Sequence, residues 1–276
     1  MIGFIEHIKN TTQMRLNGVH KFKVKIPMQF EAGSYVVKTA DTEFELVESF
    51  RLRHEVFNNE FKRNSRPGLD FDRFDTAFDH LIIYHTQLNE VIGTYRLNCT
   101  NHLDTRKIDS YTGLEFDLSS IEQFNGPFLE LGRACIKREY RKGSVISLLW
   151  RGIAEYMKLS QAEVLFGCSS LKINNPREAA LIYSYLKEEN FLSKELDCKP
   201  TRKFEMQGLD AWMNYFSVGL KDYQREEVKD LLPSLLNSYL KLGAKVAGLP
   251  AFDADFDCVD LLTVLEKNNL ANSPTV

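Results

Sequence analysis

The chain has 276 residues, enough for one large domain or two small ones, each with a hydrophobic core. Its composition, 43% hydrophobic and 26% charged, is typical of a globular protein, and a formal net charge of −3 provides no basic field for nucleic acid. The five cysteines are scattered without a CxxC pair, which argues against a disulfide framework and a zinc site, so no metal is expected. No signal peptide and no membrane-spanning run is recognisable, which favours a cytoplasmic location.

Residues 1–34 are predicted to form an N-terminal arm. Within it, Lys21, Lys23 and Lys25 alternate with apolar residues, which favours a half-exposed strand. A basic segment that touches anionic lipid headgroups is the alternative.

The first core strand is predicted over residues 35–39, followed by a helix. Thr42 and Glu45 have the spacing of a capping box at the start of that helix. Its apolar face is expected to be formed by Phe44, Val47, Phe50, Leu52 and Phe57.

Four aspartates follow within ten residues, at Asp70, Asp72, Asp75 and Asp79. The calcium-loop spacing is absent, and the aromatic residues between them indicate a loop that packs on the core. We expect this loop to direct carboxylates at a cationic group, because an amine substrate needs a carboxylate to bind it and a base to deprotonate it. Asp72 and Asp75 are predicted to be functional, and Asp70 and Asp79 structural.

A strand pair is predicted over residues 80–84 and 91–98, joined by a polar turn at residues 87–90. Arg96 interrupts the second strand, and a lone buried charge is costly. Its expected partners are Asp72, Asp75 and Glu130. A network that supports an acceptor pocket and a purely structural ion pair both remain open.

Residues 99–126 are predicted to form loops and a short helix, and residues 128–136 a buried strand that contains Glu130 and Arg133. A basic turn over residues 138–144 then leads into a helix. The N-terminus of a helix presents unpaired N–H groups to an anion; Arg141 and Lys142 add charge, and Gly143 allows close approach. The segment is consistent with a phosphate-binding turn and equally with a turn that only connects a strand to a helix, and the dinucleotide fingerprint is absent.

The remaining third of the chain alternates between strands and helices. Strands are predicted over residues 163–170, 244–249 and 259–265, and helices over residues 177–189 and 233–242, with Gly243 ending the last. Residues 196–230 are polar and weakly periodic and are interpreted as an insertion or lid. Cys168 lies in an apolar strand and is interpreted as a small buried residue, not a nucleophile.

Several motifs in this order resemble those of the GNAT acyltransferases. More narrowly, they resemble N-acyltransferases of the ornithine-lipid (lyso-ornithine lipid) synthase or haemolysin-like branch, which is related to the acyl-homoserine lactone synthases. The resemblance extends from about residue 35 to 266. The matching residues are Arg53 with Phe57, Asp72-x-Phe74-Asp75, Gly93-x-x-Arg96-Leu97, Glu130-Leu131-Gly132-Arg133, the basic turn, and Tyr239-Leu240-Lys241-Leu242-Gly243.

The resemblance implies an α/β (α+β) GNAT fold. Its central sheet is mixed and largely antiparallel, splayed between strands 4 and 5 and flanked by helices. It also implies one N-acyltransferase domain over residues 35–276, with a helical insertion or lid around residues 174–230.

The implied reaction transfers a fatty acyl group, in some relatives 3-hydroxylated, to the α-amine of an amino acid. Ornithine is the first choice of acceptor, and glycine or another amino acid the second. The implied donor is acyl carrier protein with its 4′-phosphopantetheine, or acyl-CoA, and no permanently bound cofactor is expected. Peripheral contact with the inner membrane is left open. The alternatives are a lactone synthase that uses S-adenosylmethionine, a CoA-dependent N-acetyltransferase, and a non-catalytic module that binds acyl carrier protein or a membrane.

The resemblance also assigns roles to residues. Glu130 is the candidate base, Asp72 is grouped with it as catalytic, and Tyr239 is the candidate acid for the leaving thiolate, with Tyr183 as its rival. The acceptor-binding candidates are Arg53, Phe57, Asp75, Arg96 and Arg133. The donor-binding candidates are Ala134, Cys135, Ile136, Arg141, Lys142, Gly143, Ser144 and Val145.

Overall fold

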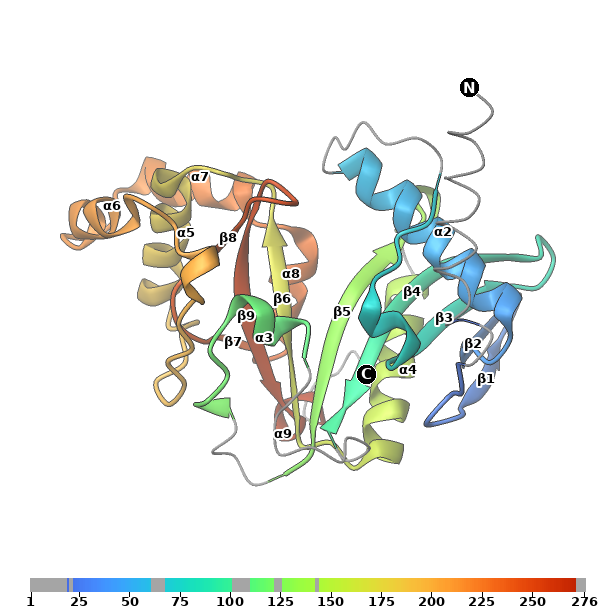
Figure 1. The fold of residues 1–276 in the computed structure, drawn as a ribbon. Helices are drawn as coiled ribbons and strands as arrows, with labels where there is room; N and C mark the ends of the chain where they lie inside the picture. Colours follow the sequence, from blue (N-terminus) through green and yellow to red (C-terminus); the bar gives the residue numbers. More distant parts are fainter. Residues whose placement is uncertain are drawn as a thin grey trace, which may run out of the picture. The chain divides into compact units, whose positions relative to one another are not determined.

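The computed structural model describes residue 19 and residues 22–60, 68–100, 110–121, 126–141 and 144–271. The chain divides into two compact units: residues 1–98 with 132–160, and residues 99–131 with 161–276. Both are built on strands of a mixed sheet, and strand β5 contributes its first half to the second unit and its second half to the first (Figure 1).

The sheet of the first unit has the strand order β1-β2-β3-β4-β5. The strands β1 to β4 pair antiparallel with their neighbours. The strand predicted over residues 35–39, the predicted hairpin of β3 and β4, and the strand predicted over residues 128–136 are confirmed. The strand bounds of the unit are β1 Gln29–Ala32, β2 Tyr35–Thr39, β3 Asp79–His85, β4 Glu90–Cys99 and β5 Phe128–Ile136.

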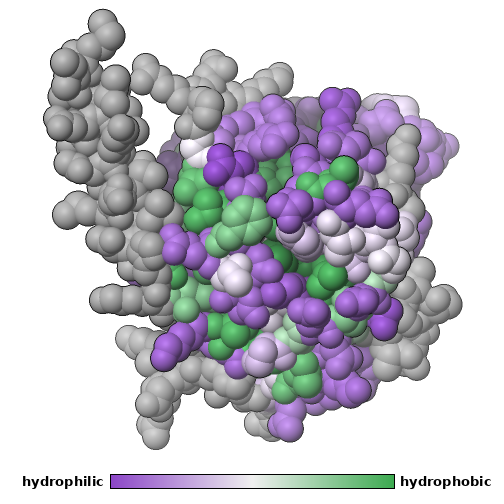
Figure 2. Space-filling model, turned by 90° about the vertical axis from the view of Figure 1, so that its right-hand side faces the viewer, coloured by the Kyte–Doolittle hydropathy of each residue, from purple (hydrophilic) through white to green (hydrophobic). Residues whose placement is uncertain are grey.

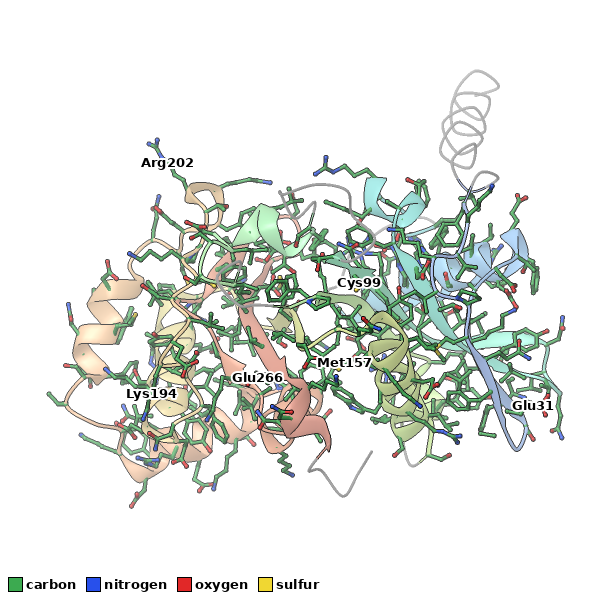
Figure 3. The ribbon with its side chains drawn as sticks, turned by 90° about the horizontal axis from the view of Figure 1, so that it is seen from below. Glu31, Cys99, Met157, Lys194, Arg202 and Glu266 are labelled. Atoms are coloured by element: carbon green, nitrogen blue, oxygen red, sulfur yellow. The ribbon has the colours of Figure 1, made fainter. Side chains whose placement is uncertain are left out.

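Two helices, α2 (Glu43–Glu60) and α4 (Ser144–Ser160), cover opposite faces of this sheet. α2 packs on the face that carries Ile82, whereas Gly152 of α4 lies against Leu81, and side chains alternate between faces along a strand. A Cβ at Gly152 would come within 3.0 Å of Leu81, so the glycine lets α4 approach the sheet closely. Met157 of the same helix, labelled in Figure 3, is also buried.

The capping box predicted for α2 is confirmed. The Glu45 backbone N–H donates to Thr42 Oγ1, and the Thr42 N–H donates to Glu45 Oε2, both at 3.3 Å. The predicted apolar face of α2 is wrong at Phe44, whose side chain is 51% exposed; Leu46 is buried in its place.

The strand predicted around Lys21, Lys23 and Lys25 is also wrong. Lys21 lies outside the described residues, and residues 22–28 form no strand. The backbone N–H groups of Lys25 and Ile26 donate instead to the Asp79 carboxylate, at 2.8 and 2.9 Å. These N–H groups donate to a side chain and not to a neighbouring strand, and the first strand, β1, begins at Gln29.

The sheet of the second unit has the order β5-β6-β9-β7, with β8 paired to β9. β5 and β6 are parallel, and their paired residues are Phe128–Glu130 with Val164–Phe166. The pairs of β9 with β6, β7 and β8 are antiparallel, so the sheet is mixed and largely antiparallel, as predicted. The strand bounds are β6 Val164–Leu171, β7 Lys245–Val246, β8 Ala251–Asp253 and β9 Cys258–Glu266.

The continuous strand predicted over residues 244–249 is wrong. Only the two residues of β7 pair, because the chain turns at Gly248, whose φ of +82° lies in the left-handed region. A Cβ there would lie 1.8 Å from the Cys198 carbonyl oxygen, so this turn requires glycine. The short strand β8 after the turn was not predicted.

Helices cover both faces of the second unit's sheet. One face, which carries Val259 and Leu261, packs with α5 and α8; the other, which carries Leu262 and Val264, packs with Phe116 just after α3. The helices predicted over residues 177–189 and 233–242 are confirmed as α5 and α8. The helix bounds are α3 Thr112–Glu115, α5 Pro176–Glu188, α6 Leu209–Phe216, α7 Asp222–Leu231, α8 Ser234–Lys241 and α9 Lys267–Ala271.

The segment interpreted as an insertion or lid contains α6 and α7. Phe216 and Val228 join the cluster formed with α5, whereas Tyr215 is 58% exposed. The intervening segment also contains a short 3-10 helix, and Figure 3 shows its Arg202 pointing away from the ribbon.

The outer surface of the first unit is mostly hydrophilic. Figure 2 shows small hydrophobic patches among hydrophilic side chains on the face drawn there, and scattered exposed apolar side chains are ordinary on a water-facing surface. Among the described helices, none has the length and apolar character needed to cross a membrane.

Candidate active-site residues

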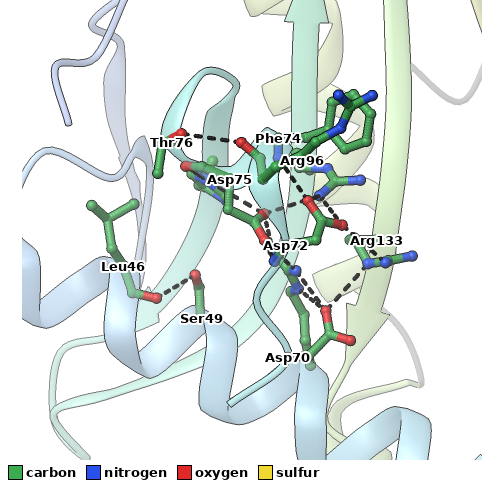
Figure 4. Close-up of polar contacts among 12 residues, drawn as sticks. Leu46, Ser49, Asp70, Asp72, Phe74, Asp75, Thr76, Arg96 and Arg133 are labelled. Carbon is green, nitrogen blue, oxygen red and sulfur yellow. Dashed lines mark hydrogen bonds and ion pairs between the residues drawn. The ribbon is translucent and has the colours of Figure 1, made fainter. Parts of the chain in front are cut away.

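The acidic segment of the first unit is folded around a short 3-10 helix, Arg73–Thr76 (Figure 4). Asp72 caps this helix, because its carboxylate accepts the Phe74 N–H at 2.8 Å. Asp75 completes the cap by accepting the Asp72 N–H at 2.7 Å. The two aspartates predicted to be functional therefore also build the turn that carries them.

Three arginines from α2, β4 and β5 converge on this turn (Figure 4). Arg53 pairs with Asp75 at 2.7 Å and with Asp70 at 2.5 Å. Arg96 pairs with Asp72 at 2.7 Å and with Asp75 at 3.1 Å. Arg133 pairs with Asp72 at 3.0 Å and with Asp70 at 3.2 Å.

The charges of this network are balanced and largely buried. Burial raises the pKa of Asp75, but Arg53 and Arg96 outweigh it and hold that pKa well below its usual value. Burial also raises the pKa of Asp70, and Arg53 and Arg133 likewise reverse the shift. The cationic groups that Asp75 faces are arginines of the chain itself, its side chain is 0% exposed, and its role toward a substrate stays a prediction.

The predicted partners of Arg96 in the acidic loop are confirmed. Its guanidinium also lies 5.5 Å from the ring centres of Phe74 and Phe78, which stack around the buried charge. Asp79 has the structural role predicted for it. Its carboxylate accepts the backbone N–H groups of Lys25 and Ile26, and it also accepts the Tyr156 hydroxyl at 2.9 Å.

A buried histidine contacts the backbone of the acidic turn. His80 is fully buried, and its Nε2 lies 3.0 Å from the Asp75 carbonyl oxygen. Burial, reinforced by Arg53, lowers the pKa of His80 to about 4 although Asp75 opposes the shift. His80 is therefore neutral at physiological pH and adds no charge to the network.

Glu130 belongs to the second unit and is 3% exposed. Its Oε1 accepts two hydrogen bonds from Thr112, one from the backbone N–H at 2.7 Å and one from the hydroxyl at 2.8 Å. Sequence reasoning did not identify Thr112. It lies in a region predicted only as loops and a short helix, and no local pattern marks it.

Three further carboxylates come together in the second unit at Glu115, Asp253 and Asp260, where one oxygen of each lies within 4.8 Å of the others. Burial, with the charges of Asp260 and Asp253, raises the pKa of Glu115 to about 9. Burial also raises the pKa of Asp260 to about 6. Sequence reasoning missed this cluster because α3, which supplies Glu115, is distant in the chain from β8 and β9.

These oxygens are of the type that hard cations prefer. Hydrogen bonds from the chain itself also reach them: Ser170 donates to Asp260 at 2.6 Å, and the Asp255 N–H donates to Asp253 at 2.8 Å. Within the described parts of the chain, no ion pair joins the cluster to a lysine or arginine. The group is therefore protonated in part at neutral pH.

Cys168 lies beside the same cluster, with its sulfur 3.5 Å from Glu115 Oε2. Burial and the neighbouring carboxylates raise the pKa of its thiol well above the ordinary value. Since the thiolate is the nucleophile, the raised pKa favours the interpretation of Cys168 as a non-nucleophilic residue, although its side chain is only partly buried.

The two tyrosines considered as the acid lie on helices of the second unit. Tyr239 lies on α8 and Tyr183 on α5, and both helices pack on the face of the sheet that carries Val259 and Leu261. The role of either tyrosine stays a prediction.

The donor-binding candidates lie along the second half of β5 and the start of α4. Burial raises the pKa of the Cys135 thiol, and Arg141 donates to the Ile136 carbonyl at 2.9 Å and pairs with Glu60 at 2.5 Å. Ser144 begins α4 and Val145 is buried. Ala134 is half-buried, and Lys142 and Gly143 lie outside the described residues.

β5 has an irregular backbone next to these positions. Arg133 has a φ of +51°, in the left-handed region, although it lies inside a strand. Such a conformation costs on the order of 1 kcal/mol for a residue with a side chain. The ion pairs of Arg133 with Asp70 and Asp72 hold its side chain in this position.

The sequence of the chain is similar to a family model and to individual proteins. Residues 52–151 match the model of the acetyltransferase (GNAT) domain. The chain is 29% identical to an L-ornithine N(alpha)-acyltransferase of Brucella abortus, over 87% of this chain and 87% of that protein. It is 28% identical to an L-ornithine N(alpha)-acyltransferase of Agrobacterium fabrum, over 87% of this chain and 83% of that protein.

The similarity to solved structures is lower. The structure of BjaI, a CoA-dependent acyl-homoserine lactone synthase, aligns with 83% of this chain and 80% of that chain, at 15% identity and a TM-score of 0.44. Similarity at this level does not assign an activity.

Proposed function

We propose that this chain, an N-acyltransferase with a GNAT domain, transfers a fatty acyl group from acyl carrier protein to the α-amine of an amino acid, with ornithine as the first choice. The similarity to two L-ornithine N(alpha)-acyltransferases over 87% of the chain carries this proposal. A 3-hydroxylated acyl chain, and glycine as a second acceptor, belong to the same proposal.

The reaction forms one bond and breaks another. The neutral α-amine attacks the thioester carbonyl, so that the N–C bond forms and the C–S bond breaks. Glu130 takes the proton that the amine loses, and that proton passes to the departing thiolate, which leaves as the free thiol of the donor. Backbone N–H groups at Ala134 to Ile136 polarise the carbonyl oxygen.

The arginine–aspartate network is proposed to bind the acceptor through its most exposed members. Asp72 has a side chain 26% exposed and Arg133 one 13% exposed, whereas Arg53 and Arg96 are almost fully buried. We therefore assign substrate contact to Asp72 for an amine and Arg133 for a carboxylate. The buried members hold those two in place, and Phe57 of α2 packs against the hydrophobic cluster that contains Leu52 and Val56.

The donor is proposed to place its pantetheine phosphate at the turn before α4. Arg141 has a side chain 38% exposed at this turn, and Ser144 is the first residue of the helix. A helix start beside a cation suits a phosphate. Because the product is a lipid, a peripheral contact with the inner membrane accompanies the proposal.

The deciding experiment is mass spectrometry of lipid extracts from a host that expresses the wild-type chain or Glu130→Gln. We expect a new N-acyl amino acid with the wild type and none with Glu130→Gln. The mass of the new species names the acceptor and the acyl chain together. Glu163→Gln is the matched control, because that side chain is 48% exposed, and it should leave the product unchanged.

Two outcomes would contradict the proposal. The absence of a new species from folded wild-type protein would remove the N-acyl amino acid product. Full product from Glu130→Gln would remove Glu130 as the base. In the first case, purified protein incubated with acyl-acyl carrier protein and S-adenosylmethionine, or with acetyl-CoA and an amine acceptor, distinguishes the lactone synthase from the CoA-dependent acetyltransferase.

A further inference from the structure

The carboxylate of Glu130 is oriented by one residue of another element. Thr112, the first residue of α3, donates from both its backbone N–H and its hydroxyl to the same oxygen, Oε1, at 2.7 and 2.8 Å. Thr112 is 1% exposed and Glu130 is 3% exposed. Two short hydrogen bonds from one buried residue leave the carboxylate little freedom to rotate.

The turn of α3 that carries Thr112 is itself held in place. Thr201 donates from its backbone N–H to the Glu115 carbonyl at 2.7 Å and from its hydroxyl to the Leu114 carbonyl at 2.9 Å. Phe116, which follows Glu115 in the chain, is 1% exposed and packs in the same cluster as Phe128 of β5. α3 therefore cannot shift along β5 without breaking these contacts, and Thr112 stays in reach of Glu130.

These contacts have a chemical consequence for a general base. A base must be ionised before it takes a proton, and hydrogen bonds donated to a carboxylate stabilise its ionised form. Burial alone acts in the opposite direction. The two donors of Thr112 thus offset the cost of keeping a charged carboxylate in a site from which water is almost excluded.

We propose that Thr112 is a positioning residue for acyl transfer: its hydroxyl holds the Glu130 carboxylate in the ionised state and in the orientation in which it accepts the proton of the attacking amine. This inference rests on the proposed function, because it takes Glu130 as the base. Thr112 itself transfers no proton.

The test compares Thr112→Val, which replaces the hydroxyl with a methyl group of similar size, with Thr112→Ser, which retains the hydroxyl. Purified proteins are assayed with L-ornithine and a 3-hydroxyacyl-acyl carrier protein. For Thr112→Val we expect kcat to fall about tenfold, within the range that general base catalysis contributes. KM for ornithine should stay within about twofold, since no substrate contact is removed. Thr112→Ser should behave like the wild type.

The pH profile separates positioning from a merely structural role. Loss of a donor to the ionised base moves the acid limb of kcat against pH upward, by about one unit for Thr112→Val. Thr112→Ser should leave the limb in place. If Thr112→Val does not fold, Thr112→Ala carries the same comparison, because it also lacks the hydroxyl and adds no bulk.

The outcomes distinguish this inference from the proposed function. Loss of turnover in Glu130→Gln together with an unchanged kcat and acid limb in Thr112→Val overturns the positioning role and leaves the function intact. An equal loss in Thr112→Ser and Thr112→Val also overturns it, because the hydroxyl is then not responsible. A wild-type protein that forms no product overturns both.

Discussion

At the scale of single residues, the first unit depends on charges that compensate one another inside the protein. Asp75 is the most central of them, because it bonds Arg53 and Arg96 and closes the cap of the 3-10 helix through the Asp72 N–H. Removing one partner from a buried ion pair leaves the other charge without compensation, which costs more than the pair contributes. The aspartate is therefore a structural requirement for the arginines around it.

The substitution Asp75→Asn should lower the free energy of unfolding by about 3–5 kcal/mol, the cost typical of breaking a buried pair. Urea unfolding followed by circular dichroism measures this change. Glu163→Gln is the control: it breaks the pair with Lys267, whose side chains are 48% and 45% exposed, and should change little because solvent screens such pairs. If Asp75→Asn lost no more free energy of unfolding than Glu163→Gln, the buried network would not stabilise the unit.

At the scale of elements, the second unit brings together carboxylates from α3, β8 and β9, and the pKa values of two of them, Glu115 and Asp260, are raised. Burial raises the pKa of Glu115 to about 9, with Asp260 and Asp253 as neighbours. Its unfolded value is about 4.3. Between these values the folded state binds more protons than the unfolded state, so stability falls as pH rises through this window.

We expect the free energy of unfolding of the wild type to decrease between pH 5 and pH 9. Glu115 alone contributes up to about 1.4 kcal/mol per pH unit. Glu115→Gln removes this titrating group, so its stability should fall less steeply over the same range. Urea unfolding at pH 5, 7 and 9 measures the slopes, with Glu163→Gln as the control that keeps the wild-type slope. A wild-type slope in Glu115→Gln would mean that the carboxyl is ionised in the folded protein.

At the scale of the whole molecule, the proposed reaction requires a donor much larger than the acceptor. Acyl carrier protein and CoA share the pantetheine arm but differ in the molecule that carries it. A preference for one donor therefore depends on contacts beyond the arm. Arg141 is a described cation of the turn before α4, and it is held by Glu60 of α2 and by the Ile136 carbonyl of β5.

Arg141→Ala should raise KM for the acyl carrier protein donor about tenfold with kcat nearly unchanged, because a phosphate contact that is uniform along the reaction affects binding alone. Steady-state kinetics with acyl carrier protein and with acyl-CoA donors of the same chain length measures both constants. Arg151→Ala, an exposed arginine in the middle of α4, is the control. A large fall in kcat without a change in KM would place Arg141 in the chemical step instead.

The sequence by itself determined most of the local structure. The apolar run over residues 128–136 located β5, the spacing of Thr42 and Glu45 located the start of α2, and Gly243 located the end of α8. The order of the motifs also indicated the GNAT domain that the family comparison finds over residues 52–151. These features depend on neighbours in the chain, so a one-dimensional pattern contains them.

Only the tertiary structure decided which charges meet. The acidic loop looked available to a cation from its sequence, but Arg53, Arg96 and Arg133 reach its carboxylates from three separate elements. Thr112 and the cluster of Glu115, Asp253 and Asp260 had no local signal at all, because α3, β5, β8 and β9 meet only after folding. The energy of a charge depends on its surroundings in space, and a pattern along the chain does not describe those surroundings.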